Sequence, residues 1–296
     1  MRIIIVGCGK VGSALAEQLS ADGHDLTLVD QSERRLSELA NTFDVATVTG
    51  NGTSYHVLKE AGVKETDLLI AVTTHDEINL LACLIASKAS GCHTIARVRD
   101  PQYVSEVGFI RDELGLSMVI NPEMSTARVV SRLIRFPSAI GVGTFAKGRI
   151  ELLDIRIPEK SRLNGMAVCE VNPLLHTDVL LCMVRRGGQT YIPKGDFILL
   201  AGDDITVIIP PREQVEFFQK IGVPNDRIGS VMIIGGGNVS YFLAKMLVAS
   251  GIAVKIIESS LERCELLSDL LPEATIIHGD GTDRDLLEEE GLSSCE

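Results

Sequence analysis

Three glycines near the start of the chain have the spacing of a phosphate-binding turn. Gly7, Gly9 and Gly12 form the pattern G-x-G-x-x-G between an apolar run at residues 3–6 and a stretch of apolar residues at helical spacing. In such a turn the first glycine permits a tight bend, the second lets a pyrophosphate approach the backbone, and the third lets the helix pack closely on the strand. Backbone N–H groups at the helix amino terminus would bind the phosphate oxygens. The alternative is that the glycines only pack the helix against the sheet.

A carboxylate follows this turn at the distance that a ribose contact requires. Asp30 ends the next apolar run, 18 residues after Gly12. A carboxylate at this position can accept hydrogen bonds from both ribose hydroxyls of adenosine and would repel a 2′-phosphate. The pair of features therefore favours NAD(H) or ATP over NADP(H).

The same pattern occurs a second time. Residues 231–258 repeat residues 3–30 at a constant offset of 228, with nine of 28 positions identical. Gly235, Gly237 and Glu258 occupy the site positions of the second copy, but Ser240 replaces the third glycine. Its side chain would lie where helix and strand should nearly touch, so the sequence leaves open whether the second copy binds a ligand. A repeat of this length indicates a duplicated domain rather than a solenoid.

The elements that must position these residues are short β-branched runs separated by helical stretches. In the first copy the expected strands are residues 3–6, 26–29, 46–49, 68–73 and 94–98. This alternation is typical of right-handed βαβ units. We therefore expect an α/β protein with a duplicated, Rossmann-like, doubly wound parallel sheet. Glu296 aligns with Asp67, so the second unit is expected to be truncated, with three strands and an exposed edge.

The middle of the chain has a different character. Residues 121–136 predict one amphipathic helix, and the following stretch predicts a small α+β subdomain with β-rich runs at 151–157, 179–185, 197–200 and 205–209. The domain boundaries that we predict are 1–136 for the first Rossmann-like subdomain with its crossover helix, 137–222 for the α+β subdomain, and 228–296 for the first half of the second Rossmann-like subdomain.

Composition excludes several classes of function. Among 296 residues, 40 acidic against 28 basic side chains give a net charge of −12, which disfavours binding to nucleic acid. No apolar run approaches the roughly 20 residues of a membrane span, and the first residues lack the pattern of a secretory signal. The seven cysteines and six histidines show no metal-ligand spacing. We expect a cytoplasmic protein without a metal site or disulfides.

Several further motifs, taken together, carry a resemblance to a known family. They are Thr-Gly-Asn-Gly-Thr at 49–53, Ala-Val-Thr-Thr-His-Asp-Glu-Ile-Asn at 71–79, Leu-Asn-Gly-Met at 163–166, Val-Arg-Arg-Gly at 184–187 and Ile-Pro-Lys-Gly-Asp at 192–196. With the two glycine turns, they resemble the TrkA family, cytoplasmic regulators of Trk-type potassium transporters built from RCK (also called KTN) domains. The resemblance covers essentially the whole chain.

The resemblance implies a set of NAD-binding positions. Arg97 would supply charge to the phosphates, with an ordinary salt bridge as the alternative. The predicted binding residues are Gly7, Cys8, Gly9, Lys10, Val11, Gly12, Asp30, Gly50, Thr73, Thr74 and Arg97, with Gly235, Gly237 and Glu258 in the second copy. The expected ligand is NAD or NADH, with ATP or ADP as the alternative.

The resemblance also implies partners and a role. It predicts a non-enzymatic regulatory subunit that binds the membrane subunit of a Trk-type transporter at the inner face of the membrane and gates potassium transport. It implies a homodimer that assembles into a four-subunit ring. The competing hypothesis is an NAD-dependent oxidoreductase with a small substrate, which would need a general acid or base beside the nicotinamide. The middle subdomain offers only His176 and no recognisable catalytic constellation.

Overall fold

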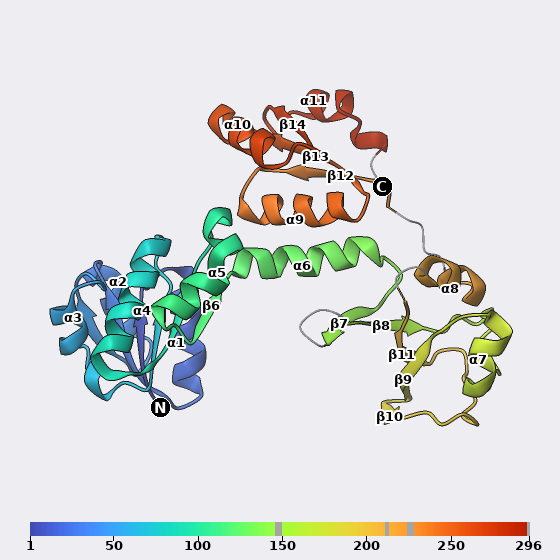
Figure 1. Ribbon diagram of the computed structural model, residues 1–296, viewed down its shortest axis with the longest axis horizontal. Coiled ribbons are helices and arrows are strands. Elements are labelled where there is room, and N and C mark those ends of the chain that lie inside the picture. Colours follow the sequence, from blue (N-terminus) through green and yellow to red (C-terminus); the bar gives the residue numbers. More distant parts are fainter. Residues whose placement is uncertain (146–149, 211–212, 224–227, 295–296) are drawn as a thin grey trace. The chain divides into compact units, whose positions relative to one another are not determined.

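The computed structural model describes residues 1–145, 150–210, 213–223 and 228–294, and these fall into two compact units, Met1–Thr126 and Ala127–Glu296. The first unit, coloured from blue to green in Figure 1, holds a six-stranded parallel sheet in the order β3-β2-β1-β4-β5-β6. Its strands are β1 (Arg2–Val6), β2 (Asp25–Asp30), β3 (Ala46–Thr49), β4 (Leu68–Ala71), β5 (His93–Arg97) and β6 (Met118–Ile120). The strand order reverses beside β1, which lies between β2 and β4.

The central strand β1 is apolar throughout because helices cover both of its faces. Ile3 and Ile5 pack with Ala16 of α1 (Lys10–Ala21) and Leu36 of α2 (Glu33–Ala40). Ile4 and Val6 pack on the other side with side chains of α3 (Tyr55–Glu60) and α4 (Asp76–Ser90). Two further helices follow, α5 (Pro101–Leu114) and α6 (Pro122–Arg135). The predicted doubly wound parallel sheet is confirmed.

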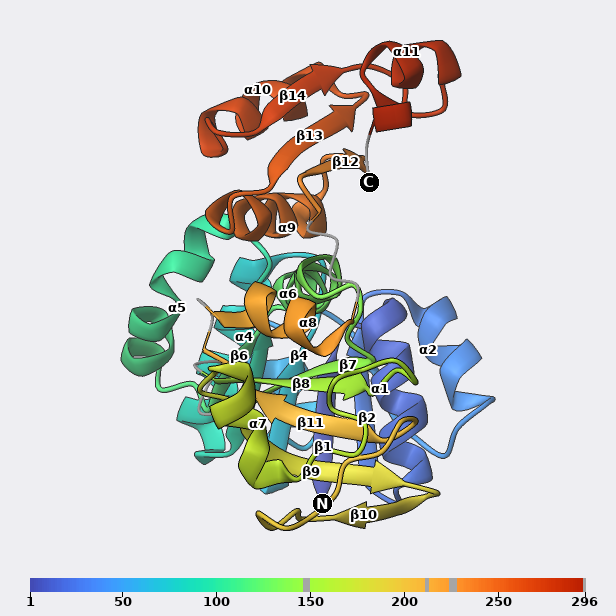
Figure 2. The same cartoon turned by 90° about the vertical axis from the view of Figure 1, so that its right-hand side faces the viewer.

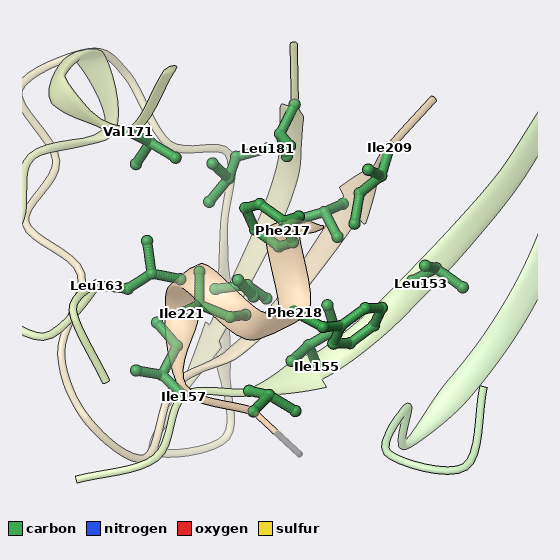
Figure 3. Close-up of a cluster of buried hydrophobic side chains, with 14 of the residues drawn as sticks. Leu153, Ile155, Ile157, Leu163, Val171, Leu181, Ile209, Phe217, Phe218 and Ile221 are labelled. Carbon is green, nitrogen blue, oxygen red and sulfur yellow. The ribbon is translucent and has the colours of Figure 1, made fainter. Parts of the chain in front are cut away.

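The second unit begins with a five-stranded antiparallel sheet in the order β10-β9-β11-β8-β7, which can be followed in Figure 2. Its elements are β7 (Gly141–Phe145), β8 (Ile150–Arg156), α7 (Val168–Leu175), β9 (Leu180–Arg186), β10 (Gln189–Tyr191), β11 (Asp204–Ile208) and α8 (Gln214–Ile221). Phe217, Phe218 and Ile221 of α8 are fully buried against this sheet, in one cluster with Leu153 and Ile155 of β8, and Figure 3 shows Phe218 next to Ile155.

One expected strand does not form. Residues 197–200 make only an isolated bridge between Ile198 and Ala167. The backbone of this run pairs instead with the loop before α7, where Gly165 N–H donates to the Leu199 carbonyl and Leu199 N–H donates to the Met166 carbonyl. These bonds satisfy the run locally, so it joins no ladder of the sheet.

The second copy of the repeat forms its own parallel sheet of three strands. The elements are β12 (Ser230–Ile234), α9 (Asn238–Ala249), β13 (Ala253–Glu258), α10 (Leu261–Leu270), β14 (Thr275–His278) and α11 (Arg284–Glu289), and the sheet order is β12-β13-β14. Within the described residues β12 lacks the neighbour that β4 provides for β1. Ile234 is 53% exposed, whereas Val6 at the equivalent position is 2% exposed. The duplicated fold with a three-stranded second unit is therefore as predicted.

Candidate nucleotide-binding site

The glycine turn between β1 and α1 needs glycine for steric reasons at two positions. Gly7 has φ +98°, and a Cβ there would lie 2.8 Å from the Thr73 backbone nitrogen. A Cβ on Gly12 would lie 1.9 Å from the Gly7 carbonyl oxygen, a clash with a backbone atom that only displacement of α1 could relieve. Gly9 is different, because a Cβ there would meet no atom within 4 Å. The turn thus packs tightly on its inner side and leaves open space at its outer side.

Asp30 fastens the end of β2 to this turn. Its Oδ2 accepts the Cys8 N–H at 2.7 Å and its Oδ1 accepts the Ser32 N–H at 2.8 Å. Each carboxylate oxygen has two lone pairs, so both retain capacity for one more donor. A single side chain therefore sets the conformation of the turn and still presents acceptors to a ligand.

A buried amide positions the residues that follow β4. Asn79 of α4 is 0% exposed, and its Oδ1 accepts both the N–H and the hydroxyl of Thr73 at 2.8 Å. Its Nδ2 donates to the Arg97 carbonyl at 2.9 Å. Arg99 donates to the Thr74 carbonyl and pairs with Asp76. The Thr73–Thr74 segment is therefore held from both sides, by α4 and by the end of β5.

These segments surround a cavity of about 430 Å³ at the carboxyl ends of β1, β2 and β4. This volume lies within the range of ligand pockets, and the edge where strand order reverses is where ligands bind in open α/β sheets. The lining residues are Val6, Gly7, Gly9, Val29, Asp30, Gln31, Ser32, Arg35, Gly50, Asn51, Gly52, Val72, Thr73, Thr74, His75 and Ile78. The structure thus brings together six of the predicted positions: Gly7, Gly9, Asp30, Gly50, Thr73 and Thr74.

Other predicted positions of the first copy lie outside this lining. Burial, with the charge of Asp30, raises the pKa of the Cys8 thiol to about 12, so the sulfur is unreactive, and the backbone N–H of Cys8 is donated to Asp30. Val11 and Gly12 pack α1 on the sheet, and Lys10 is exposed at the first position of α1. Arg97 pairs with Glu123 of α6, with both side chains largely buried. Arg99, two residues further along the chain, donates to the Thr74 carbonyl of the pocket segment.

The second copy repeats the turn and its carboxylate. Gly235 has φ +93°, Gly237 precedes α9 as Gly9 precedes α1, and Glu258 accepts the Gly236 N–H at 2.6 Å and the Ser260 N–H at 2.7 Å. These backbone hydrogen bonds lower the pKa of Glu258. The turn keeps its conformation although Ser240 stands at the third position. Among the described residues no group of side chains is arranged to hold a metal ion, and no helix is long and apolar enough to cross a membrane.

Comparison with known proteins gives consistent matches along the chain. The TrkA-N domain model matches residues 3–122 and again 231–296, and the TrkA-C domain model matches residues 152–222. The chain is 38% identical over its full length to a Trk system potassium uptake protein TrkA homolog of Archaeoglobus fulgidus, and 35% identical to the Trk system potassium uptake protein TrkA of Halomonas elongata. It spans 66% and 65% of the length of these two relatives.

Solved structures with the same fold include RCK domains. The chain aligns with the GsuK RCK domain at a TM-score of 0.67 and 19% identity, covering 99% of this chain and 61% of that one. It aligns with the GsuK channel bound to NAD at a TM-score of 0.66 and 19% identity, covering 98% and 51%. At these identities the likeness concerns the fold.

Proposed function

The chain belongs to the family of proteins with TrkA-N and TrkA-C domains, and from this premise we propose that it is a non-enzymatic, nucleotide-sensing regulatory subunit of a Trk-type potassium uptake system. The observation that carries the proposal is the pocket at the carboxyl ends of β1, β2 and β4, where Asp30 is bonded to the glycine turn. The open space beside Gly9 fits a pyrophosphate, and the remaining lone pairs of Asp30 fit ribose hydroxyls. NAD or NADH is the proposed ligand, with ATP or ADP as the alternative.

A chain of contacts leads from this pocket towards the next part of the protein. Asn79 bonds both Thr73 in the pocket and the backbone of Arg97. The Arg97 side chain pairs with Glu123 in the first turn of α6, the helix that continues into the second unit. A bound nucleotide that favours one arrangement of these contacts would shift the protein towards it, which is what a regulatory ligand must do.

The proposed setting follows from the family. The partner is the membrane subunit of a Trk-type transporter, the protein acts in the cytoplasm at the inner face of the membrane, and it forms a homodimer or tetramer. We also propose the domain boundaries 1–136, 137–222 and 228–296. The second glycine turn, with Gly235, Gly237 and Glu258, is a candidate for a second site.

Mass spectrometry of the purified protein under non-denaturing conditions tests the proposal. It reports the retained small molecule and the number of subunits together, and we expect an adenine nucleotide and an even number of chains. Titration with NADH in the presence of a panel of carbonyl substrates separates a regulator from an oxidoreductase. Of the lining side chains, His75 carries the imidazole that an oxidoreductase would use as its general acid or base. Binding without oxidation of NADH supports a regulator, whereas measurable turnover would replace it with an oxidoreductase.

A further inference from the structure

The internal duplication provides a comparison between two glycine turns with the same backbone. Gly7 and Gly235 have φ values of +98° and +93°. Arg35 and Arg263 occupy equivalent positions of the two copies, and their backbones have the same local structure. The backbone N–H of each arginine donates to the side chain of the N-cap serine of its helix, α2 or α10, at 3.4 and 3.3 Å. A difference between the two arginine side chains must therefore come from the residues around them.

In the second copy the arginine side chain is bonded to the turn itself. Arg263 Nε donates to the Gly236 carbonyl at 2.6 Å, and its Nη2 donates to Asn238 Oδ1 at 3.1 Å. Asn238 is the first residue of α9, the position where a bound phosphate would accept backbone hydrogen bonds. The guanidinium therefore occupies the turn and uses its donors on the protein.

In the first copy this arrangement lacks one of its two acceptors, the side-chain oxygen. The residue equivalent to Asn238 is Lys10, whose ammonium group has three donors and no acceptor and repels a guanidinium. The Arg35 side chain is exposed, lines the pocket, and has no hydrogen-bond or ion-pair partner among the residues that the structure describes. Its charge lies near enough to the turn to act on the Cys8 thiol: it lowers the pKa of that thiol, which burial and Asp30 raise.

We propose that Arg35 is a further binding residue of the first pocket, which contacts the phosphates of a bound adenosine diphosphate moiety, and that Lys10 keeps it available by replacing the asparagine that captures Arg263 in the second turn. Guanidinium groups bind phosphates by paired, charge-assisted hydrogen bonds, so the contact adds affinity that adenosine alone would not gain. By the same reasoning, the Arg263 side chain already occupies the phosphate position of the second turn, and a phosphate that binds there must first displace it. This inference rests on the proposed nucleotide site.

The test measures the affinity of the full chain for ADP by titration calorimetry in five variants, three single and two double. Both side chains are exposed, so the substitutions leave the fold intact. Arg35→Leu is expected to weaken ADP binding about tenfold or more and to leave adenosine binding unchanged. Lys10→Met removes only the charge, whereas Lys10→Asn also restores an acceptor that can capture Arg35. Lys10→Asn is therefore expected to weaken ADP binding several-fold more than Lys10→Met.

The double variants decide the mechanism. In the Arg35→Leu background, Lys10→Asn and Lys10→Met should have equal affinities, because no guanidinium remains to be captured. The inference would be overturned if the single variants Lys10→Asn and Lys10→Met bound ADP with equal affinity, or if Arg35→Leu bound ADP as tightly as the unaltered protein. If the unaltered protein binds neither ADP nor NADH, the proposed nucleotide site itself fails, which is a different outcome.

Discussion

Replacing Asp30 with alanine separates its two roles, because the second copy contains a matched control. The carboxylate accepts two backbone N–H groups, at 2.7 and 2.8 Å, and in the proposed complex would also accept ribose hydroxyls. Hydrogen bonds to a charged group contribute about 1.5–3 kcal/mol each. The loss of ribose contacts of this size predicts that Asp30→Ala weakens NADH binding by at least roughly tenfold, since about 1.4 kcal/mol corresponds to a factor of ten.

The structural role has its own magnitude. Cys8 is 3% exposed, so its N–H finds little water when the carboxylate is removed, and an unsatisfied buried donor costs about 1–3 kcal/mol. Glu258→Ala removes the equivalent bonds to Gly236 and Ser260 at 2.6 and 2.7 Å. Each variant should therefore lower the hydrogen-exchange protection of its own turn by a similar amount.

The assay combines calorimetry with NADH and amide exchange at Cys8 and Gly236. We expect Asp30→Ala to lose both affinity and local protection, and Glu258→Ala to lose protection in the second turn with unchanged affinity in the first. If Asp30→Ala loses protection but binds NADH as the unaltered protein does, Asp30 is only a structural residue and the adenosine does not lie beside it.

Three further outcomes follow from the same structure. Asn79→Leu leaves the Thr73 N–H and the Arg97 carbonyl without their buried partner. We therefore expect the free energy of opening, measured by hydrogen exchange of the β4 amides, to fall by about 1–3 kcal/mol and NADH binding to weaken. Unchanged amide exchange in β4 would contradict this. Burial tends to raise the pKa of Asp203, but hydrogen bonds from Arg186 and the Leu200 N–H lower it below its ordinary value. The stability from this carboxylate is therefore present above about pH 4 and is lost as pH falls through the folded-state pKa. Asp203→Asn should make stability depend less on pH below about pH 4, and an unchanged dependence in acid would count against a stabilising role of this ion pair. Alkylation at pH 8 followed by mass spectrometry should label exposed Cys169 quickly and Cys8 hardly at all, because a pKa near 12 leaves about one thiolate in 10⁴; equal labelling would show that the turn opens readily.

Much of the fold could be predicted because burial on both faces of a parallel sheet leaves a clear mark on the sequence. The continuous apolar run of β1 and the glycines of the turn have no other simple explanation, and the position of Asp30 follows from them. The run at 197–200 has the same composition as a strand, but its backbone bonds a neighbouring loop, and composition does not distinguish these partners. The contact of Arg99 with the Thr74 carbonyl could not be predicted, because β5 ends at Arg97 and strand geometry gives no direction for side chains beyond it.

The side chains of the candidate site depend on contacts that one sequence position does not determine. Arg35 and Arg263 are the same residue type after the same serine cap, yet one lines a pocket and the other is bonded across its own turn. We attribute the difference to Asn238, which bonds Arg263, and to Lys10, which stands at the equivalent position of the first copy. Both lie on another helix than the arginine, and no periodic pattern in the sequence marks them. A repeated glycine pattern therefore identifies two similar backbones but not two equivalent sites. The position after the second glycine deserves the same weight as the third glycine when such a turn is assessed for phosphate binding.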